Sequence, residues 1–117
     1  MDLSNVKRFL PDAELSEMRP CTTPKKVQFH LLAVGRKDFT AKVIDVLKLE
    51  KLLLANKSFN DVKSSAELGV VKAVYNGTEI SALASGRVVV KKTADEKQAA
   101  ELLNELAPLI KGSLFKG

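Results

Sequence analysis

The clearest pattern of apolar and polar positions lies in the second half of the chain. Three short runs rich in β-branched residues are separated there by two turn signals. Asn76-Gly77 is a strong signal for a two-residue hairpin, because a type I′ turn needs positive φ at both central positions. Such a turn pairs Tyr75 with Thr78. The same register, carried down the ladder, ends with Val70 opposite Leu83.

This register divides the side chains of the hairpin between two faces. The first face suits a core covered by helices and contains Val71, Ala73, Tyr75, Thr78, Ile80 and Ala82. The second face mixes polar and apolar groups and contains Val70, Lys72, Val74, Glu79, Ser81 and Leu83. Exposed apolar patches usually mark contact sites. We therefore take the second face, extended by His30 and Lys92, as the candidate partner surface.

Two other interpretations of this face stay open. It could be an ordinary solvated face of an antiparallel sheet, or the N-terminal arm could cover it. Glu79 at its centre counts against contact with phosphate.

A second turn and a helix follow the hairpin. Ser85-Gly86 predicts a turn into a third strand, Arg87 to Lys92, through either a two-residue loop or a three-residue loop with a bulge. The two loops give different registers, so the core-facing valines are not determined. Thr93-x-x-Glu96 is a capping box that predicts a helix start. The apolar stripe of this helix contains Ala99, Ala100, Leu103, Leu106, Ala107 and Ile110. We expect Pro108 to kink or end the helix, with Gly112 as a second stop.

A strand is predicted in the first half of the chain. Val27 to Val34 alternates at its start and ends at Gly35. Phe29 and Leu31 lie on one face of this strand, and Gln28 and His30 on the other.

A helix is predicted after this strand, from Asp38 as N-cap to about Asn56. Its apolar sector is expected to contain Phe39, Val43, Ile44, Val46, Leu47, Leu53 and Leu54, with Leu49 and Leu52 outside it. This sector is wider than one sheet contact needs, which favours a second helix or a partner subunit beside it. Residues 57–66 then predict a polar connection, with Phe59 and Val62 as anchors.

The element order predicts an α+β fold. We expect an antiparallel sheet of about four strands with two helices on one face, within residues 27–112. Residues 1–26, with prolines at positions 11, 20 and 24, predict an arm in which Asp12 to Met18 forms one or two helical turns. Residues 113–117 predict a frayed tail.

Composition narrows the class of protein. The chain has 117 residues, of which 45% are hydrophobic and 28% charged, as expected for one soluble globular domain. It lacks both a run near the ~20 apolar residues of a membrane span and a signal-peptide pattern. A cytoplasmic location without membrane contact is therefore expected. The net charge of +5 gives a mild bias toward polyanionic partners, since the charges are spread along the chain.

Residues that could carry chemistry are sparse. His30 is the only histidine and Cys21 the only cysteine, so we expect no metal site and no disulfide. No base accompanies the serines and threonines, and the glycines are scattered rather than grouped in a phosphate loop. We therefore expect no catalytic residues and no cofactor, which argues against an enzyme.

The segment from Thr78 to Val90 resembles part of one repeat of the TATA-box-binding protein fold. It reads Thr-Glu-Ile-Ser-Ala-Leu-Ala-Ser-Gly-Arg-Val-Val-Val. That family has a Thr-rich strand, an apolar run into Ser-Gly-Lys/Arg and another apolar strand. A long Ala-containing helix follows in the family, as at residues 93–107 here. The resemblance extends over about residues 26–112 and implies a sheet with one face open to partners.

The chain departs from that family at the residues that would read DNA. It carries one repeat, whereas TATA-binding members carry two. Leu83 stands where those members have a wedge phenylalanine, and the second wedge position falls near Glu67 or Leu68. The asparagine expected in the first strand is replaced around Phe29. Because wedges unstack the bases, these departures argue against a TATA-box reader.

Two functional hypotheses follow. The first is a non-catalytic module that binds DNA or RNA through the open sheet face and self-associates, two copies rebuilding a two-repeat surface about a two-fold axis. The second is a protein-interaction or assembly module without nucleic-acid binding.

Overall fold

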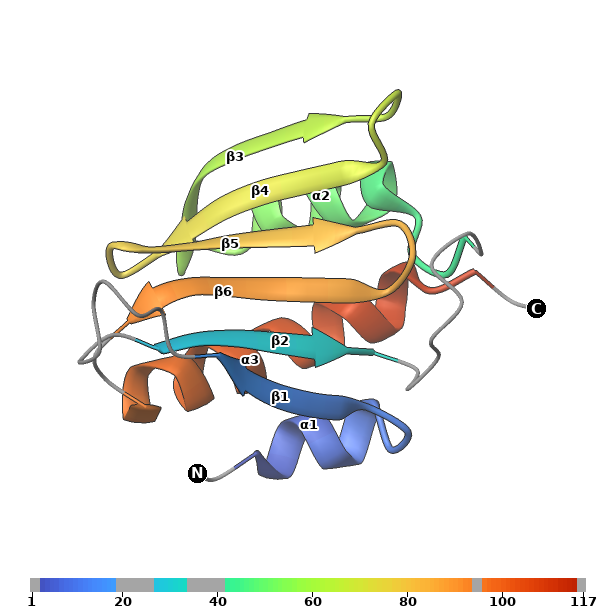
Figure 1. Cartoon of the computed structure of the whole chain (residues 1–117). Coiled ribbons are helices and arrows are strands. Elements are labelled where there is room, and N and C mark those ends of the chain that lie inside the picture. The colour runs from blue at the N-terminus through green and yellow to red at the C-terminus, as the bar shows by residue number, and fades with distance from the viewer. Residues whose placement is uncertain (1–2, 19–26, 34–41, 94–95, 116–117) are drawn as a thin grey trace.

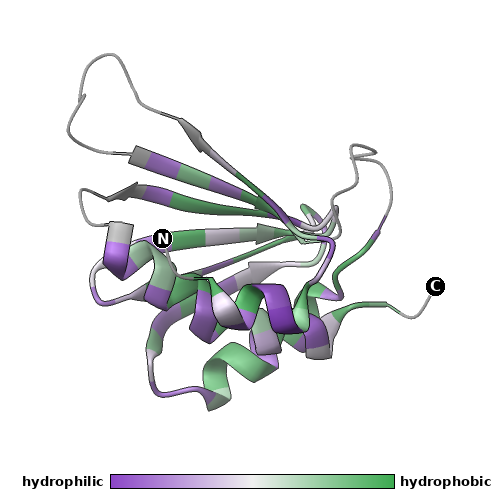
Figure 2. Cartoon of the chain, turned by 90° about the horizontal axis from the view of Figure 1, so that it is seen from below, coloured by the Kyte–Doolittle hydropathy of each residue, from purple (hydrophilic) through white to green (hydrophobic). Residues whose placement is uncertain are grey.

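The computed structural model describes residues 3–18, 27–33, 42–93 and 96–115. These residues form six strands and three helices (Figure 1). In chain order the elements are α1 (Ser4–Phe9), β1 (Glu14–Met18), β2 (Val27–Leu32), α2 (Val46–Ala55), β3 (Phe59–Ser65), β4 (Val70–Tyr75), β5 (Thr78–Leu83), β6 (Arg87–Thr93) and α3 (Glu96–Ser113). The strands make one antiparallel sheet in the order β1-β2-β6-β5-β4-β3. All three helices lie on one side of it (Figure 2).

The predicted α+β class and antiparallel sheet are confirmed, but the sheet has six strands rather than about four. The two additional strands are β1 and β3. Glu14–Met18 was expected to be helical, and it instead pairs along its whole length with β2. Phe59–Ser65 was expected to be a connection, and it pairs with β4. Both are edge strands, which pair with a neighbour on one side and face water on the other. Polar residues are therefore tolerated in them, and these residues obscure the alternation expected of a strand.

The hairpin of β4 and β5 has the predicted turn and register. Asn76 and Gly77 have φ of 47° and 81°, as a type I′ turn requires. The ladder runs from Tyr75 opposite Thr78 to Val70 opposite Leu83. The face predicted for the core is turned toward the helices, with Val71, Ala73, Thr78, Ile80 and Ala82 buried.

The turn between β5 and β6 is a three-residue loop, which settles the register left open above. The amide of Gly86 donates to the carbonyl of Leu83 over 2.9 Å, and Gly86 has φ of 95°. Ala82 lies opposite Val88 in the next pair of the ladder. Val88 and Val90 are therefore buried beneath the helices, while Val89 belongs to the other face.

Helix α2 begins later than predicted. Asp45 is its N-cap, with Oδ1 accepting from the Lys48 amide over 3.3 Å; Asp38, the expected N-cap, lies outside the described residues. Val43 and Ile44 precede the helix because their amides are used elsewhere: both donate to the carbonyl of Ala84, over 2.6 and 2.9 Å. Tertiary backbone bonds therefore replace the first turns expected from the sequence.

The expected apolar sector of this helix was also wrong. Val46, Leu49 and Leu53 are the buried residues of α2. Leu47 and Leu54, assigned to the buried sector, are 48% and 65% exposed. The sector was drawn for a longer helix that included residues 39–44, and those residues shifted its centre away from Leu49. Contact between α2 and α3 does explain part of the apolar excess, as expected.

Helix α3 buries the predicted stripe, and Leu102 in addition. It continues through Pro108, where an end or a kink was expected, and ends at Ser113, beside the predicted stop at Gly112. Proline has no N–H to donate to the carbonyl four residues earlier, that of Asn104. The Asn5 side-chain amide donates to this carbonyl instead, over 3.4 Å. The capping-box side chains of Thr93 and Glu96 lie outside the described residues.

Asn104 also caps helix α1, which has no side-chain cap of its own. Its Oδ1 accepts from the amides of Asn5 and Val6, over 3.2 and 3.3 Å. These are the two donors that an N-cap residue normally satisfies. In the described part of the N-terminal arm, α1 is thus held against α3 on the helix side, and β1 forms the edge of the sheet beside β2, so the arm does not cover the face that carries no helix.

The residues after α3 pair with the residues just before α2. Leu114 bridges Ile44, and the Phe115 amide donates to the carbonyl of Val43 over 2.9 Å. The first residues of the tail predicted to fray are therefore paired up to Phe115.

We predict that Asn104→Ala lowers the free energy of unfolding by about 1–2 kcal/mol, because two amides of α1 lose their acceptor. Urea unfolding followed by circular dichroism measures this loss. Asn104→Asp keeps the acceptor oxygens and should retain most of the stability. A loss as large for Asp as for Ala would contradict the capping role.

Candidate functional site

The face of the sheet that carries no helix is here called the open face. Cross-strand pairs place side chains from all six strands in one row along it, because residues paired across strands point to the same side. This row contains Lys63, Lys72, Ser81, Val89, His30 and Ser16. It crosses the sheet from one edge to the other.

The structure brings together the predicted partner surface. Lys72 and Glu79 are exposed, Val70, Val74 and Leu83 are half-buried, and Ser81 and His30 are buried among their neighbours on this face. The side chain of Lys92, the remaining member, lies outside the described residues.

Other residues of the open face were missed. Lys63 was missed because its strand had been interpreted as a connection. Val89 and Arg87 depended on the undetermined loop between β5 and β6. Lys91 also belongs to this face, since it is exposed and alternates with the buried Val90. The alternation of Lys91 with Val90 was the only sequence signal for the position of Lys91. It could be used only once the register between β5 and β6 was known.

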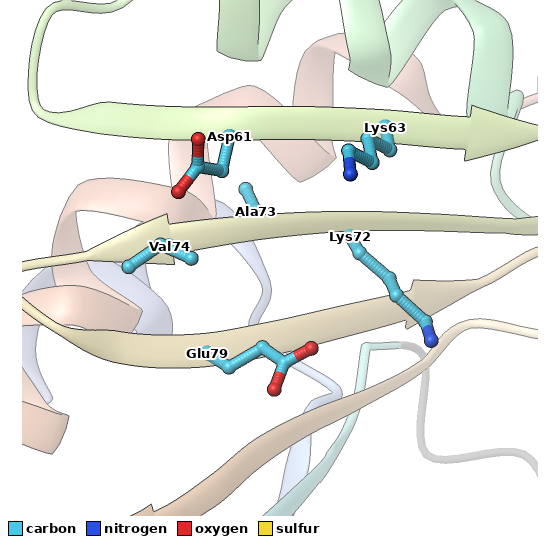
Figure 3. A pocket seen from close by; sticks show the side chains of 6 residues that line it. All are labelled: Asp61, Lys63, Lys72, Ala73, Val74 and Glu79. Carbon is cyan, nitrogen blue, oxygen red and sulfur yellow. The ribbon is translucent and has the colours of Figure 1, made fainter.

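Like charges face each other on strands β3 and β4. Lys63 lies directly opposite Lys72, an arrangement that destabilises a sheet. Both border an open groove of about 440 Å³, whose lining residues are Asp61, Lys63, Lys72, Ala73, Val74 and Glu79. Figure 3 shows the two carboxylates toward one end of the groove and the two lysines toward the other. The lysine side chain on β4 reaches across β5, and its ammonium group lies away from the Glu79 carboxylate.

These four charged groups are not neutralised by one another. Within the described parts of the chain, neither lysine and neither carboxylate makes an ion pair or a side-chain hydrogen bond. Asp61 also has a left-handed backbone, with φ of 50°, at the irregularity in pairing between Asn60 and Lys63. Asparagine, aspartate and glycine are the residues that tolerate this conformation best.

His30 sits in a hydrogen-bonded cluster on the same face. The Arg87 guanidinium donates to Nδ1 of His30, with Nη2 at 2.7 Å and Nε at 3.2 Å. This ring nitrogen must therefore be unprotonated, so that the neutral imidazole carries its proton on Nε2. The side-chain amide nitrogen of Gln28 is placed 2.9 Å from Nε2. Because this nitrogen is itself a donor, the amide accepts the Nε2 proton with its oxygen turned toward the ring instead.

Burial lowers the pKa of His30 below its ordinary value of 6.5, and the positive charge of Arg87 lowers it further. Both ring nitrogens are occupied by Arg87 and Gln28, which fits the structural role expected for this residue. No group of three or more His, Cys, Asp or Glu side chains within the described ranges could hold a metal ion. Cys21 lies outside those ranges. None of the described helices is both long and apolar enough to cross a membrane.

Comparison of this chain with protein-family models, with curated proteins and with solved structures finds no match. The resemblance to one repeat of the TATA-box-binding protein fold therefore stays a prediction. Function has to be argued from the geometry of the open face.

We predict that stability falls as the pH drops through the titration range of His30. The unfolded chain takes up a proton near pH 6.5, whereas the folded chain resists protonation until a lower pH, so the free energy of unfolding decreases between about pH 7.5 and 5. Urea unfolding across this range measures the slope. Because His30 is the only histidine, His30→Gln should flatten this component. An unchanged slope in the variant would contradict the prediction.

Proposed function

We propose that this chain is a small non-catalytic module that binds nucleic acid through its open face, by contacts to the phosphate backbone that do not depend on sequence. The observation that carries the proposal is that Lys63 lies opposite Lys72 and that neither ammonium group pairs with a carboxylate of the described residues. A sheet gains nothing in stability from such a pair, whereas an anion lying across it would neutralise both charges.

The charge of the whole open face supports a polyanionic partner. Its described cationic side chains are Lys63, Lys72, Lys91 and Arg87, against the three carboxylates of Asp61, Glu79 and Glu14. Glu14 lies on β1, at the opposite edge of the sheet from the pair of lysines on β3 and β4. Glu79, which was expected to oppose phosphate contact, has its carboxylate away from the ammonium end of Lys72 (Figure 3). A phosphate backbone could therefore lie on the lysine side of the groove.

The placement of aromatic side chains favours duplex over single-stranded nucleic acid. Proteins that bind single-stranded nucleic acid stack its bases on aromatic side chains. Here the strand aromatics Phe29, Phe59 and Tyr75 pack with the core on the helix side. Burial raises the pKa of Tyr75, and Glu105 and Glu101 of α3 raise it further, as expected for a ring turned toward that helix. No aromatic ring of the described strands is therefore offered to bases on the open face, which favours contact with the phosphate backbone.

The order of elements also supports a relation to one repeat of the TATA-box-binding protein fold. From β2 onward the chain runs strand, helix, four strands and helix, with the last strand beside the first. At the expected wedge positions, Leu83 is half-buried in the sheet and Leu68 lies in the exposed turn between β3 and β4. We therefore propose binding without insertion between bases, and no recognition of a TATA sequence.

We predict that a labelled mixed-sequence DNA duplex binds at low salt, with affinity falling as salt rises. If the four cations each contact one phosphate, the slope of log K against log salt should be about −3 to −4. Fluorescence anisotropy at several salt concentrations measures it.

A matched pair of variants assigns binding to the open face. Lys72→Glu with Lys91→Glu should abolish binding, whereas Lys48→Glu with Lys51→Glu on α2 changes the net charge equally and should retain most of it. Absence of binding to either duplex or single-stranded nucleic acid at low salt would overturn the proposal.

A second candidate function is protein assembly, which the exposed leucines of α2 favour. Leu47 and Leu54 are separated by two helical turns, so both lie on one side of the helix, directed away from the core. Apolar residues this exposed commonly belong to contact surfaces.

We predict for this candidate that the chain self-associates at high concentration and that Leu47→Gln with Leu54→Gln reduces the association at least about tenfold. Sedimentation equilibrium measures the association constant, and Leu68→Gln in an exposed turn is the matched control. A wild-type chain that is monomeric at all concentrations would remove self-association from the proposal.

A further inference from the structure

The geometry points to a phosphate-binding subsite formed by Lys63, Lys72 and the hydroxyl of Ser81. The inference rests on the proposed function and assigns its central contact. The three residues are consecutive members of one cross-strand row, on β3, β4 and β5 respectively. Their side chains all point to the open face.

Ser81 provides the evidence that these three residues form a ligand-binding site. This residue is only 7% exposed. Within the described parts of the chain its hydroxyl makes no hydrogen bond. A buried hydroxyl left without a partner is a cost to folding, and buried polar groups in proteins are rarely left in this state. A ligand oxygen above the row would accept this proton.

The small size of serine also shapes the surface. Ser81 lies between Lys72 on β4 and Val89 on β6, both of which have longer side chains. Serine therefore leaves room above β5 beside the groove that Lys63 and Lys72 line, and the Lys72 side chain reaches across this strand (Figure 3). Lys63 lies on β3, directly opposite Lys72. Side chains paired in this way across two strands have Cβ atoms about 5 Å apart. Two ammonium groups and one hydroxyl can therefore converge on one anion.

A phosphodiester fits these donors better than other anions. It presents two unesterified oxygens with a single negative charge, so it can accept from the hydroxyl and from both lysines at once. Asp61 and Glu79 line the opposite end of the groove, where they would repel a group of higher negative charge. The same carboxylates direct a nucleic-acid backbone along the row toward Val89 and Arg87, away from that end.

Three single variants test the subsite by anisotropy with the same labelled duplex. Lys63→Gln and Lys72→Gln should each weaken binding about tenfold at 50 mM salt and reduce the salt slope by about 1. Lys51→Gln on α2 removes the same charge from the helix side and should leave both values near those of the wild type.

Ser81→Ala gives a signature that a structural role would not produce. It should weaken binding about threefold to tenfold, since one hydrogen bond to a charged group is lost. The salt slope should stay unchanged because no charge is removed. The free energy of unfolding should not fall, since an unpaired buried hydroxyl has been deleted. A fall in stability with unchanged binding would overturn the role of Ser81.

A titration with dimethyl phosphate, a singly charged phosphodiester, followed by the backbone amide shifts of residues 63, 72 and 81, separates the subsite from the proposed function. Normal DNA affinity in Lys63→Gln, Lys72→Gln and Ser81→Ala would overturn the subsite and leave nucleic-acid binding standing. Shifts at these amides in a chain that binds no DNA would support the subsite and overturn nucleic-acid binding. Neither shifts nor DNA binding would overturn both.

Discussion

The turn at Asn76-Gly77 is the constraint on which the rest of the sheet depends. Positive φ at both positions leaves only one way to pair β4 with β5. A slip of one residue would turn one of the two strands over relative to the other, so that either Lys72 or Glu79 would face the helices. β5 in turn positions β6, and β6 positions β2. The core face and the open face therefore both follow from this local feature.

Features set by neighbouring residues were predictable from sequence, while those set by distant contacts were not. The hairpin register and the buried stripe of α3 arise from local backbone preference and from helical periodicity. The start of α2 depends on the carbonyl of Ala84, forty residues away in sequence, which accepts from Val43 and Ile44. The passage of α3 through Pro108 depends similarly on Asn5, at the other end of the chain. Neither contact leaves a local signal.

The same distinction applies to the candidate site. The hairpin members of the open face followed from alternation alone, because their register was determined. The pairing of Lys63 with Lys72 could not be predicted, since β3 is a polar edge strand whose regular alternation is broken by a bulge at Asp61. The contact of Arg87 with His30 required knowing that β6 lies beside β2, which is a property of the whole sheet. A sequence pattern could identify the face but not its charge arrangement.

The costs to stability within the open face are not evenly distributed. On the side of β2 and β6, His30 is neutral, buried and hydrogen-bonded at both ring nitrogens. On the side of β3 to β5, two lysines oppose each other and Ser81 is buried, and none of the three finds a side-chain partner among the described residues. Substitution of either lysine by threonine, or of the serine by alanine, would remove these costs and keep a good strand. Local conflicts of this kind concentrate at functional sites in natural proteins. Their position on the uncovered face, around one groove, favours binding over a purely structural explanation.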